Sequence, residues 1–169
     1  MTDRLSRLWT PHRMAYVTGE ETGGEQTQPD GCPFCRIPVG DDETGLMLRR
    51  GDLAYVVLNL HPYNPGHLMV LPYRHVAAYE DMTAAECAEI AALTQQALRT
   101  VQAVSHPHAF NVGLNLGGVA GGSLADHLHQ HVVPRWSGDT NFITVVAGVK
   151  VIPQLLADTR ALLVEAWVA

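Results

Sequence analysis

The sequence predicts an α+β fold, in which a five-stranded antiparallel sheet carries one long helix and a C-terminal helix. Short apolar runs bounded by turn residues predict the strands, and two apolar repeats at helical spacing predict the helices. With 169 residues, 47% hydrophobic and 17% charged, the chain is long enough for one well-buried core. We therefore expect a single domain over residues 1–169. Residues 1–30 form an N-terminal extension, in which the polar stretch 18–30 is expected to be a mobile loop.

The strands are predicted on either side of the long helix. Two of them form a hairpin around the turn at 50–52, and Pro72 ends the third because proline cannot donate to a sheet ladder. Three strands come before the helix and two follow it. The five predicted strands are residues 45–49, 53–58, 67–71, 109–116 and 127–133.

The long helix is predicted to begin at Thr83. Thr83 and Glu86 have the spacing of a capping box, in which hydroxyl and carboxylate each satisfy a free N–H of the first turn. Apolar residues then recur at helical spacing until the segment 105–107, where a proline stops the helix. A second helix is predicted over residues 153–168. The apolar positions of the long helix are Ile90, Leu93, Ala97, Leu98 and Val101.

The charge balance argues against several classes of partner. The net charge is −6 and Lys150 is the single lysine, so the chain lacks the basic stripe that a nucleic-acid surface needs. No window approaches about 18 uncharged apolar residues, and the first 30 residues lack the apolar core of a signal peptide. We expect a cytoplasmic protein with neither nucleic acid nor membrane as partner. Its three cysteines do not make a disulfide framework.

Three alternating histidines are the strongest chemical signal in the chain. His127, His129 and His131 have a spacing of two, which directs all three imidazoles to one face of a strand. Histidine, with an ordinary pKa of about 6.5, exchanges protons and acts as a nucleophile at neutral pH. Just upstream, the glycine-rich run 117–122 and Ser123 offer backbone N–H groups that can form an anion-binding concavity. Together these features suit attack on a phosphate group.

These residues carry a resemblance to a known family. The pattern His-x-His-x-His followed by Val132 and Val133 resembles the signature of the histidine triad (HIT) superfamily of nucleotide hydrolases and transferases. Segment 59–67 (NLHPYNPGH) is similar to the dinucleoside-polyphosphate branch. Segments 133–142 and 8–14 resemble the bacterial subgroup described as diadenosine tetraphosphate phosphorylase-like. The resemblance covers about residues 8–160 and implies a HIT-like fold.

The resemblance implies a role for each catalytic side chain. His129 is the expected nucleophile, and His131 is expected to donate to a phosphate oxygen or to the backbone near His129. His127 completes the triad, and His67 is expected to complete a hydrogen-bonded relay. Ser123 stands where some branches have glutamine, and it is expected to help the leaving group.

The resemblance also implies a set of substrate-binding residues. Asn59 matches the position that bonds ribose hydroxyls, although an asparagine before Pro62 also suits a turn cap. Arg135 and Trp136 are candidates for phosphate or base contact, and packing of Trp136 on the sheet is an equal alternative. The expected substrate-binding residues are Asn59, Asn115, Gly121, Gly122, Ser123 and His131.

A metal site is expected beside the triad. Cys32 and Cys35 form half of a zinc-binding set, since two thiolates two residues apart can hold one tetrahedral ion. The resemblance implies that His75 and His127 supply the other two ligands and that the zinc is structural. The alternative is a pair of reduced cysteines packed in the core. A divalent cation that accompanies the substrate is also plausible, because this acidic chain has few cations to neutralise a polyphosphate.

The resemblance implies an enzyme that converts diadenosine tetraphosphate and inorganic phosphate to ATP and ADP through a nucleotidyl-histidine. With water as acceptor, the same chemistry is a hydrolase that yields ATP and AMP. A nucleoside phosphoramidate hydrolase of the mononucleotide branch is a further alternative, against which Asn59 counts because that branch typically has aspartate there. A nucleotide-binding signalling module is the non-enzymatic alternative. By analogy we expect a homo-oligomer, dimer or tetramer, which associates through the long helix, with the apolar residues 90–101 and Trp167 as its surface.

Overall fold

The computed structural model describes residues 31–121, 124–140, 142–147 and 151–167. The expected N-terminal extension, its loop at 18–30 and the segment 8–14 lie outside these residues, as do Gly122 and Ser123. None of the helices in the described ranges is long and apolar enough to cross a membrane.

Five antiparallel strands form one sheet, as the sequence predicts. The order across the sheet is β1-β2-β3-β5-β4, so that β5 lies between β3 and the edge strand β4. The strands are β1 (Met47–Arg50), β2 (Ala54–Leu58), β3 (Leu68–Pro72), β4 (Ala109–Leu114) and β5 (Gln130–Arg135).

Helix α3 (Ala84–Ser105) confirms the long helix and its capping box. The Thr83 side chain accepts a hydrogen bond from the Glu86 N–H, and the Glu86 carboxylate accepts one from the Thr83 N–H. The helix ends at His106, which adopts a left-handed conformation with φ 45°. The other helices are α2 (Pro33–Arg36), α4 (Phe142–Ala147) and α5 (Leu156–Glu165).

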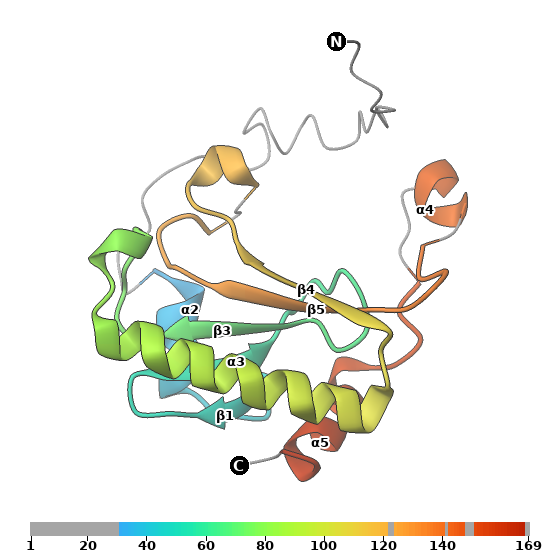
Figure 1. Ribbon diagram of the computed structural model, residues 1–169, viewed down its shortest axis with the longest axis horizontal. Helices are drawn as coiled ribbons and strands as arrows, with labels where there is room; N and C mark the ends of the chain where they lie inside the picture. Colours follow the sequence, from blue (N-terminus) through green and yellow to red (C-terminus); the bar gives the residue numbers. More distant parts are fainter. Residues whose placement is uncertain (1–30, 122–123, 141, 148–150, 168–169) are drawn as a thin grey trace.

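The two faces of the sheet bury different sets of side chains. Helix α3 covers one face of the sheet (Figure 1). Leu68 and Val70 of β3 point to that face, where Leu163 of α5 completes the core. Met69 and Leu71 point to the opposite face, where they pack with Cys32 and Phe34 at α2. Because neighbouring residues in a strand point to opposite faces, the histidines that share the face of Met69 are kept clear of α3.

Strand β5 begins three residues later than predicted, at Gln130 instead of His127. The register that pairs Leu68 with Val132 would bring Pro72 opposite Leu128, and Pro72 has no N–H to extend the ladder. The Leu128 N–H instead donates to the Val76 carbonyl, at 2.7 Å. His127 and His129 therefore lie in a segment that precedes the strand.

The apolar residues of α3 that we expected to form a subunit interface are buried within the chain itself. Ile90, Leu93, Ala97 and Val101 are buried against the sheet, and the partly buried Trp167 packs against the same core. The expectation that these residues form a subunit interface is therefore wrong for the stripe on α3, because it is already covered. The C-terminal helix α5 is shorter than the predicted range 153–168, and α4 was not predicted from the sequence.

Candidate active site and metal centre

His67 and His131 form a hydrogen-bonded pair whose proton positions the backbone determines. The Tyr63 N–H donates to His67 Nδ1 at 3.0 Å, so this nitrogen must be unprotonated and Nε2 must carry the proton. His67 Nε2 lies 3.0 Å from His131 Nδ1 and therefore donates to it. The remaining His131 proton then sits on Nε2. In this arrangement, His131 presents an N–H donor to a ligand.

His129 has the opposite arrangement. Its Nδ1 lies 2.8 Å from the His127 carbonyl oxygen, and because a carbonyl only accepts, Nδ1 carries the proton. The Nε2 lone pair of His129 is therefore available. The His129 and His131 ring centroids are 4.9 Å apart, so an unprotonated nitrogen lies beside the N–H donor of His131. A nucleophile next to a hydrogen-bond donor is the pairing that substitution at phosphorus requires.

Burial keeps these imidazoles neutral. Desolvation, with a smaller contribution from neighbouring histidines, lowers the pKa of His67 to about 3 and that of His131 to about 4. Burial also lowers the pKa of His129, although the hydrogen bond to the His127 carbonyl works in the other direction. At neutral pH the His129 imidazole is therefore neutral, with its proton on Nδ1 and an unprotonated Nε2.

The His127 side chain lies in a cluster with two cysteines and His75. Its Nε2 lies 3.0 Å from the Pro72 carbonyl and donates to it, which leaves Nδ1 unprotonated. Nδ1 lies 3.5 Å from the sulfur atoms of both Cys32 and Cys35, and Cys35 Sγ lies 3.3 Å from His75 Nδ1. One potential ligand atom from each of the four residues lies within 4.8 Å of all the others.

These distances fit a tetrahedral zinc ion. Zinc–sulfur and zinc–nitrogen bonds of ordinary length at tetrahedral angles place a sulfur about 3.6 Å from a nitrogen, close to the observed 3.3–3.5 Å. The hydrogen bond from His127 to Pro72 is the kind of outer contact that orients a metal-bound imidazole. Helix α2 is held at this site by the Tyr55 hydroxyl, which donates to the Phe34 carbonyl at 2.7 Å. The four residues expected from the sequence thus form a candidate metal centre.

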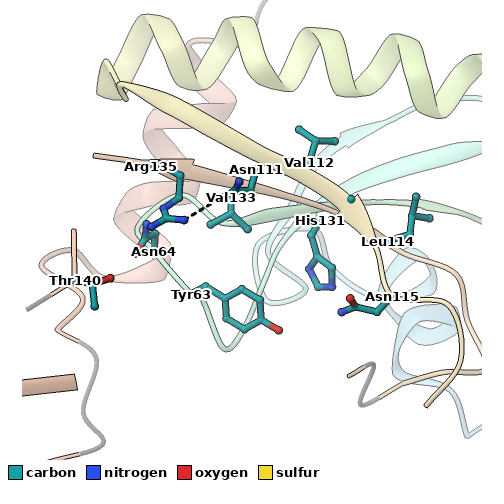
Figure 2. Close-up of a pocket in the computed structure, with 11 residues that line it drawn as sticks. Tyr63, Asn64, Asn111, Val112, Leu114, Asn115, His131, Val133, Arg135 and Thr140 are labelled. Atoms are coloured by element: carbon teal, nitrogen blue, oxygen red, sulfur yellow. Dashed lines mark hydrogen bonds between the residues drawn. The ribbon is translucent and has the colours of Figure 1, made fainter. Parts of the chain in front are cut away.

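Two cavities meet at His131. The larger cavity, about 690 Å³, is lined mainly by apolar side chains such as Phe34, Leu46 and Val57, and contains His129 and His131. The smaller cavity, about 410 Å³, runs along β4 and β5 from His131 to Arg135. Figure 2 shows His131 and Asn115 at one end of the smaller cavity, Arg135 and Thr140 at the other, and Tyr63 between them. Tyr63, Asn115 and His131 line both cavities.

The remaining expected site residues divide between these cavities and the undescribed segment. Asn59 and Gly121 line the larger cavity, and Asn115 lines both. The Asn59 side-chain oxygen Oδ1 accepts a hydrogen bond from the His61 N–H at 2.9 Å, so Asn59 does cap a turn. His127, which we expected among the catalytic groups, lines neither cavity and contacts His129 through its carbonyl oxygen. Gly122 and Ser123 lie outside the described residues.

Two aromatic residues of the site, Tyr63 and Phe34, were not predicted from the sequence. Tyr63 packs on the rings of both His67 and His131, with centroids 4.7 and 5.9 Å away. Phe34 lies 5.1 Å from the His129 ring and 5.6 Å from the His127 ring. Both lie inside motifs that the sequence showed, Phe34 between the two cysteines and Tyr63 in segment 59–67. Their positions in these motifs were the available signal.

Comparisons with known proteins agree with this geometry. Residues 44–138 match the family model of the HIT domain. The chain is 58% identical to the AP-4-A phosphorylase of Mycobacterium tuberculosis (strain ATCC 25618 / H37Rv), over 98% of this chain and 86% of that protein. It is 30% identical to the asymmetrical bis(5'-nucleosyl)-tetraphosphatase of Schizosaccharomyces pombe, over 63% of this chain and 56% of that protein.

Solved structures share the fold. A zinc-bound histidine triad family protein from Mycobacterium smegmatis has a TM-score of 0.64 at 24% identity, covering 82% of this chain and 94% of that one. A hypothetical histidine triad nucleotide-binding protein from Sulfolobus tokodaii has a TM-score of 0.65 at 22% identity, covering 80% and 91%. The chain therefore belongs to the histidine triad (HIT) family.

Proposed function

We propose that this protein is a nucleotidyltransferase that cleaves diadenosine tetraphosphate with inorganic phosphate to give ATP and ADP. The observation that carries the proposal is the unprotonated Nε2 of His129, since its Nδ1 proton is held by the His127 carbonyl at 2.8 Å. The 58% identity to a protein named AP-4-A phosphorylase supports both the substrate and phosphate as the acceptor.

The reaction is proposed to proceed in two displacements. His129 Nε2 forms a bond to the α-phosphorus of one adenosine, while the bond from that phosphorus to the bridging oxygen breaks and ATP leaves. An oxygen of inorganic phosphate then forms a bond to the same phosphorus, the nitrogen–phosphorus bond breaks, and ADP leaves. Each step exchanges one bond for another at phosphorus, and His129 returns to its starting state.

The neighbouring residues are proposed to support the transferred group. His131 Nε2–H donates to a non-bridging phosphate oxygen, and His67 keeps that proton on Nε2 by donating to His131 Nδ1. The apolar walls of the larger cavity suit the adenine ring. Asn59 and Asn115 are proposed to bind the ribose and the phosphates. The glycine-rich run, with Gly121, Gly122 and Ser123, is proposed to donate to phosphate oxygens and to assist the leaving group.

We further propose that Cys32, Cys35, His75 and His127 hold a structural zinc ion. Two thiolates and two imidazoles are a donor set that zinc prefers, and four protein ligands leave no position for substrate. When bound, the ion crosslinks α2 to the segments that follow β3 and precede β5. That crosslink would steady the His127 carbonyl, which orients His129.

We also propose that residues 1–169 form a single domain and that the protein self-associates. Within the described ranges, β4 pairs with β5 alone, so β4 is an edge strand of the sheet. A sheet edge of this kind is a natural surface for a symmetric partner. Sedimentation equilibrium of the purified protein measures the oligomeric state directly.

The test of the proposed function is product analysis with diadenosine tetraphosphate, with and without inorganic phosphate. ATP and ADP formed only when phosphate is present are the expected products. ATP and AMP formed regardless of phosphate would instead identify a hydrolase, the second candidate. His129→Ala is expected to abolish turnover but to retain nucleotide binding. His106→Asn is a matched control, because it removes an exposed imidazole at a left-handed position that asparagine tolerates.

A further inference from the structure

The proposed two-displacement reaction assigns no role to the smaller cavity. The larger cavity contains His129, and its mainly apolar walls suit the nucleoside that is transferred, whereas a dinucleotide brings a second nucleoside and further phosphates. The smaller cavity opens from the same point, since Tyr63, Asn115 and His131 line both. We propose that the smaller cavity binds the leaving nucleoside polyphosphate, a proposal that rests on the proposed function.

The direction of β5 supports this assignment. His129 lines only the larger cavity, while His131, Val133 and Arg135 line the smaller one and share one face of the chain. Arg135 lies four residues along the strand from His131, a span of about 14 Å at the usual rise per residue. A phosphate chain that starts at His131 can therefore extend along β5 to Arg135.

Between His131 and Arg135, the wall of the smaller cavity includes a glycine, which leaves the backbone accessible. Gly113 of β4 pairs with His131 across the ladder and lines the smaller cavity. A side-chain carbon added at Gly113 would meet no atom within 4 Å. A ligand can thus approach the backbone closely beside the His131 donor, without displacing a side chain.

Arg135 supplies the charge and the donors at the far end. Among the described residues that line the two cavities, it is the only lysine or arginine. Its Nε and Nη2 donate to Asp139 at 2.6 and 3.0 Å, and Nη1 donates to the Asn111 side-chain oxygen at 2.7 Å (Figure 2). Nη1 and Nη2 each keep a second N–H for a ligand. Asp139 offsets part of the charge, and in return it holds the guanidinium in one orientation.

The polar side chains around Arg135 suit a nucleotide. Asn111 and Thr140 line the same end of the cavity, so amide and hydroxyl groups surround the guanidinium. Phosphate oxygens and ribose hydroxyls are the natural partners of such a set. The larger cavity has the complementary character, with mainly apolar walls that suit a base. This contrast favours the polyphosphate end of the leaving group for the smaller cavity.

The test compares two substrates that transfer the same nucleotide. Diadenosine tetraphosphate releases a nucleoside triphosphate, whereas adenosine 5'-(4-nitrophenyl phosphate) releases a small phenolate that cannot reach Arg135. Asn111→Leu and Arg135→Lys are expected to lower kcat/KM for diadenosine tetraphosphate about tenfold, since each weakens contacts to a charged leaving group. The nitrophenyl ester should react at an unchanged rate. Gln102→Leu, at an exposed position of α3 outside both cavities, replaces an amide by leucine as Asn111→Leu does and is the matched control.

The outcomes separate this proposal from the proposed function. An equal loss with both substrates would show that the variants damage the whole site, and no loss with either would show that the cavity takes no part. Both results overturn the subsite. A higher KM for inorganic phosphate, measured with the nitrophenyl ester, would assign the cavity to the acceptor and also overturn it. A wild-type protein that converts neither substrate would overturn the proposed function itself.

Discussion

The His67–His131 hydrogen bond allows a sharp test by two substitutions at one position. In His67→Asn, the side-chain oxygen can take the place of Nδ1 and accept from the Tyr63 N–H, but no donor reaches His131. In His67→Gln, the amide nitrogen can take the place of Nε2 and still donate to His131 Nδ1. The two variants therefore separate the two hydrogen bonds of His67: asparagine keeps the acceptor for the Tyr63 N–H, and glutamine keeps the donor, 3.0 Å from His131 Nδ1, that sets the proton position on His131.

The size of the effect follows from burial. His67 is fully buried, so the asparagine variant leaves His131 Nδ1 as a shielded acceptor without its donor. An unsatisfied group of this kind costs about 2 kcal/mol, which corresponds to about a 30-fold loss of kcat/KM if the cost falls on the transition state. The glutamine variant is expected to retain most of the wild-type kcat/KM. Steady-state kinetics with diadenosine tetraphosphate and phosphate measure both, with thermal melts as the check on folding.

Two results would refute this reasoning. Equal losses in the asparagine and glutamine variants would show that the imidazole ring, and not its donation to His131, is what matters. An asparagine variant with wild-type kcat/KM would show that the pair does not act in catalysis. The predicted outcome is a difference between the variants in kcat/KM that is larger than any difference in their melting temperatures.

Two further predictions concern the metal and pH. The Cys35→Ala variant is expected to lose stoichiometric zinc, measured by elemental analysis. Its Tm should fall by at least about 5 °C, because the crosslink between α2 and the catalytic segment is lost. The control variant Cys87→Ala should retain the metal, and equal zinc contents in the two variants would contradict the proposed site. The free energy of unfolding should fall as pH decreases from about 6.5 to about 4. The pKa values of His67 and His131 in the folded protein are about 3 and about 4, which is below the value of a histidine in the unfolded chain. The unfolded chain therefore binds protons first as the pH falls, and this favours unfolding. Urea denaturation across this range measures the slope, and a double His67→Asn, His131→Asn variant should have a shallower one.

The sheet and the long helix were predictable because their signals are local. Alternating or apolar runs between turn residues mark the strands, and Thr83 with Glu86 marks the start of α3. The start of β5 was not predictable from its own residues. It depends on where Pro72, a residue of another strand, ends the ladder. The apolar stripe of α3 was misassigned to an interface because periodicity alone does not tell which surface covers it.

The candidate site was predictable in its residues but not in its proton positions. The sequence motifs identify two groups of residues, and the fold brings the members of each group together. One group is His67, His129 and His131, and the other is the four candidate metal ligands. The tautomers depend on single backbone groups, the Tyr63 N–H and the His127 carbonyl, whose positions only the folded chain supplies. The smaller cavity likewise depends on the pairing of β4 with β5. No spacing of residues in the sequence predicts this cavity.

The central claim is that His129 carries the transferred nucleotide. The most direct measurement is mass spectrometry of protein mixed with diadenosine tetraphosphate in the absence of phosphate, quenched under alkaline conditions that preserve a phosphoramidate bond. The account predicts a mass increase of one adenylyl group, mapped to His129 and removed when phosphate is added. An adduct on another residue, or rapid turnover of the His129→Ala variant, would contradict it.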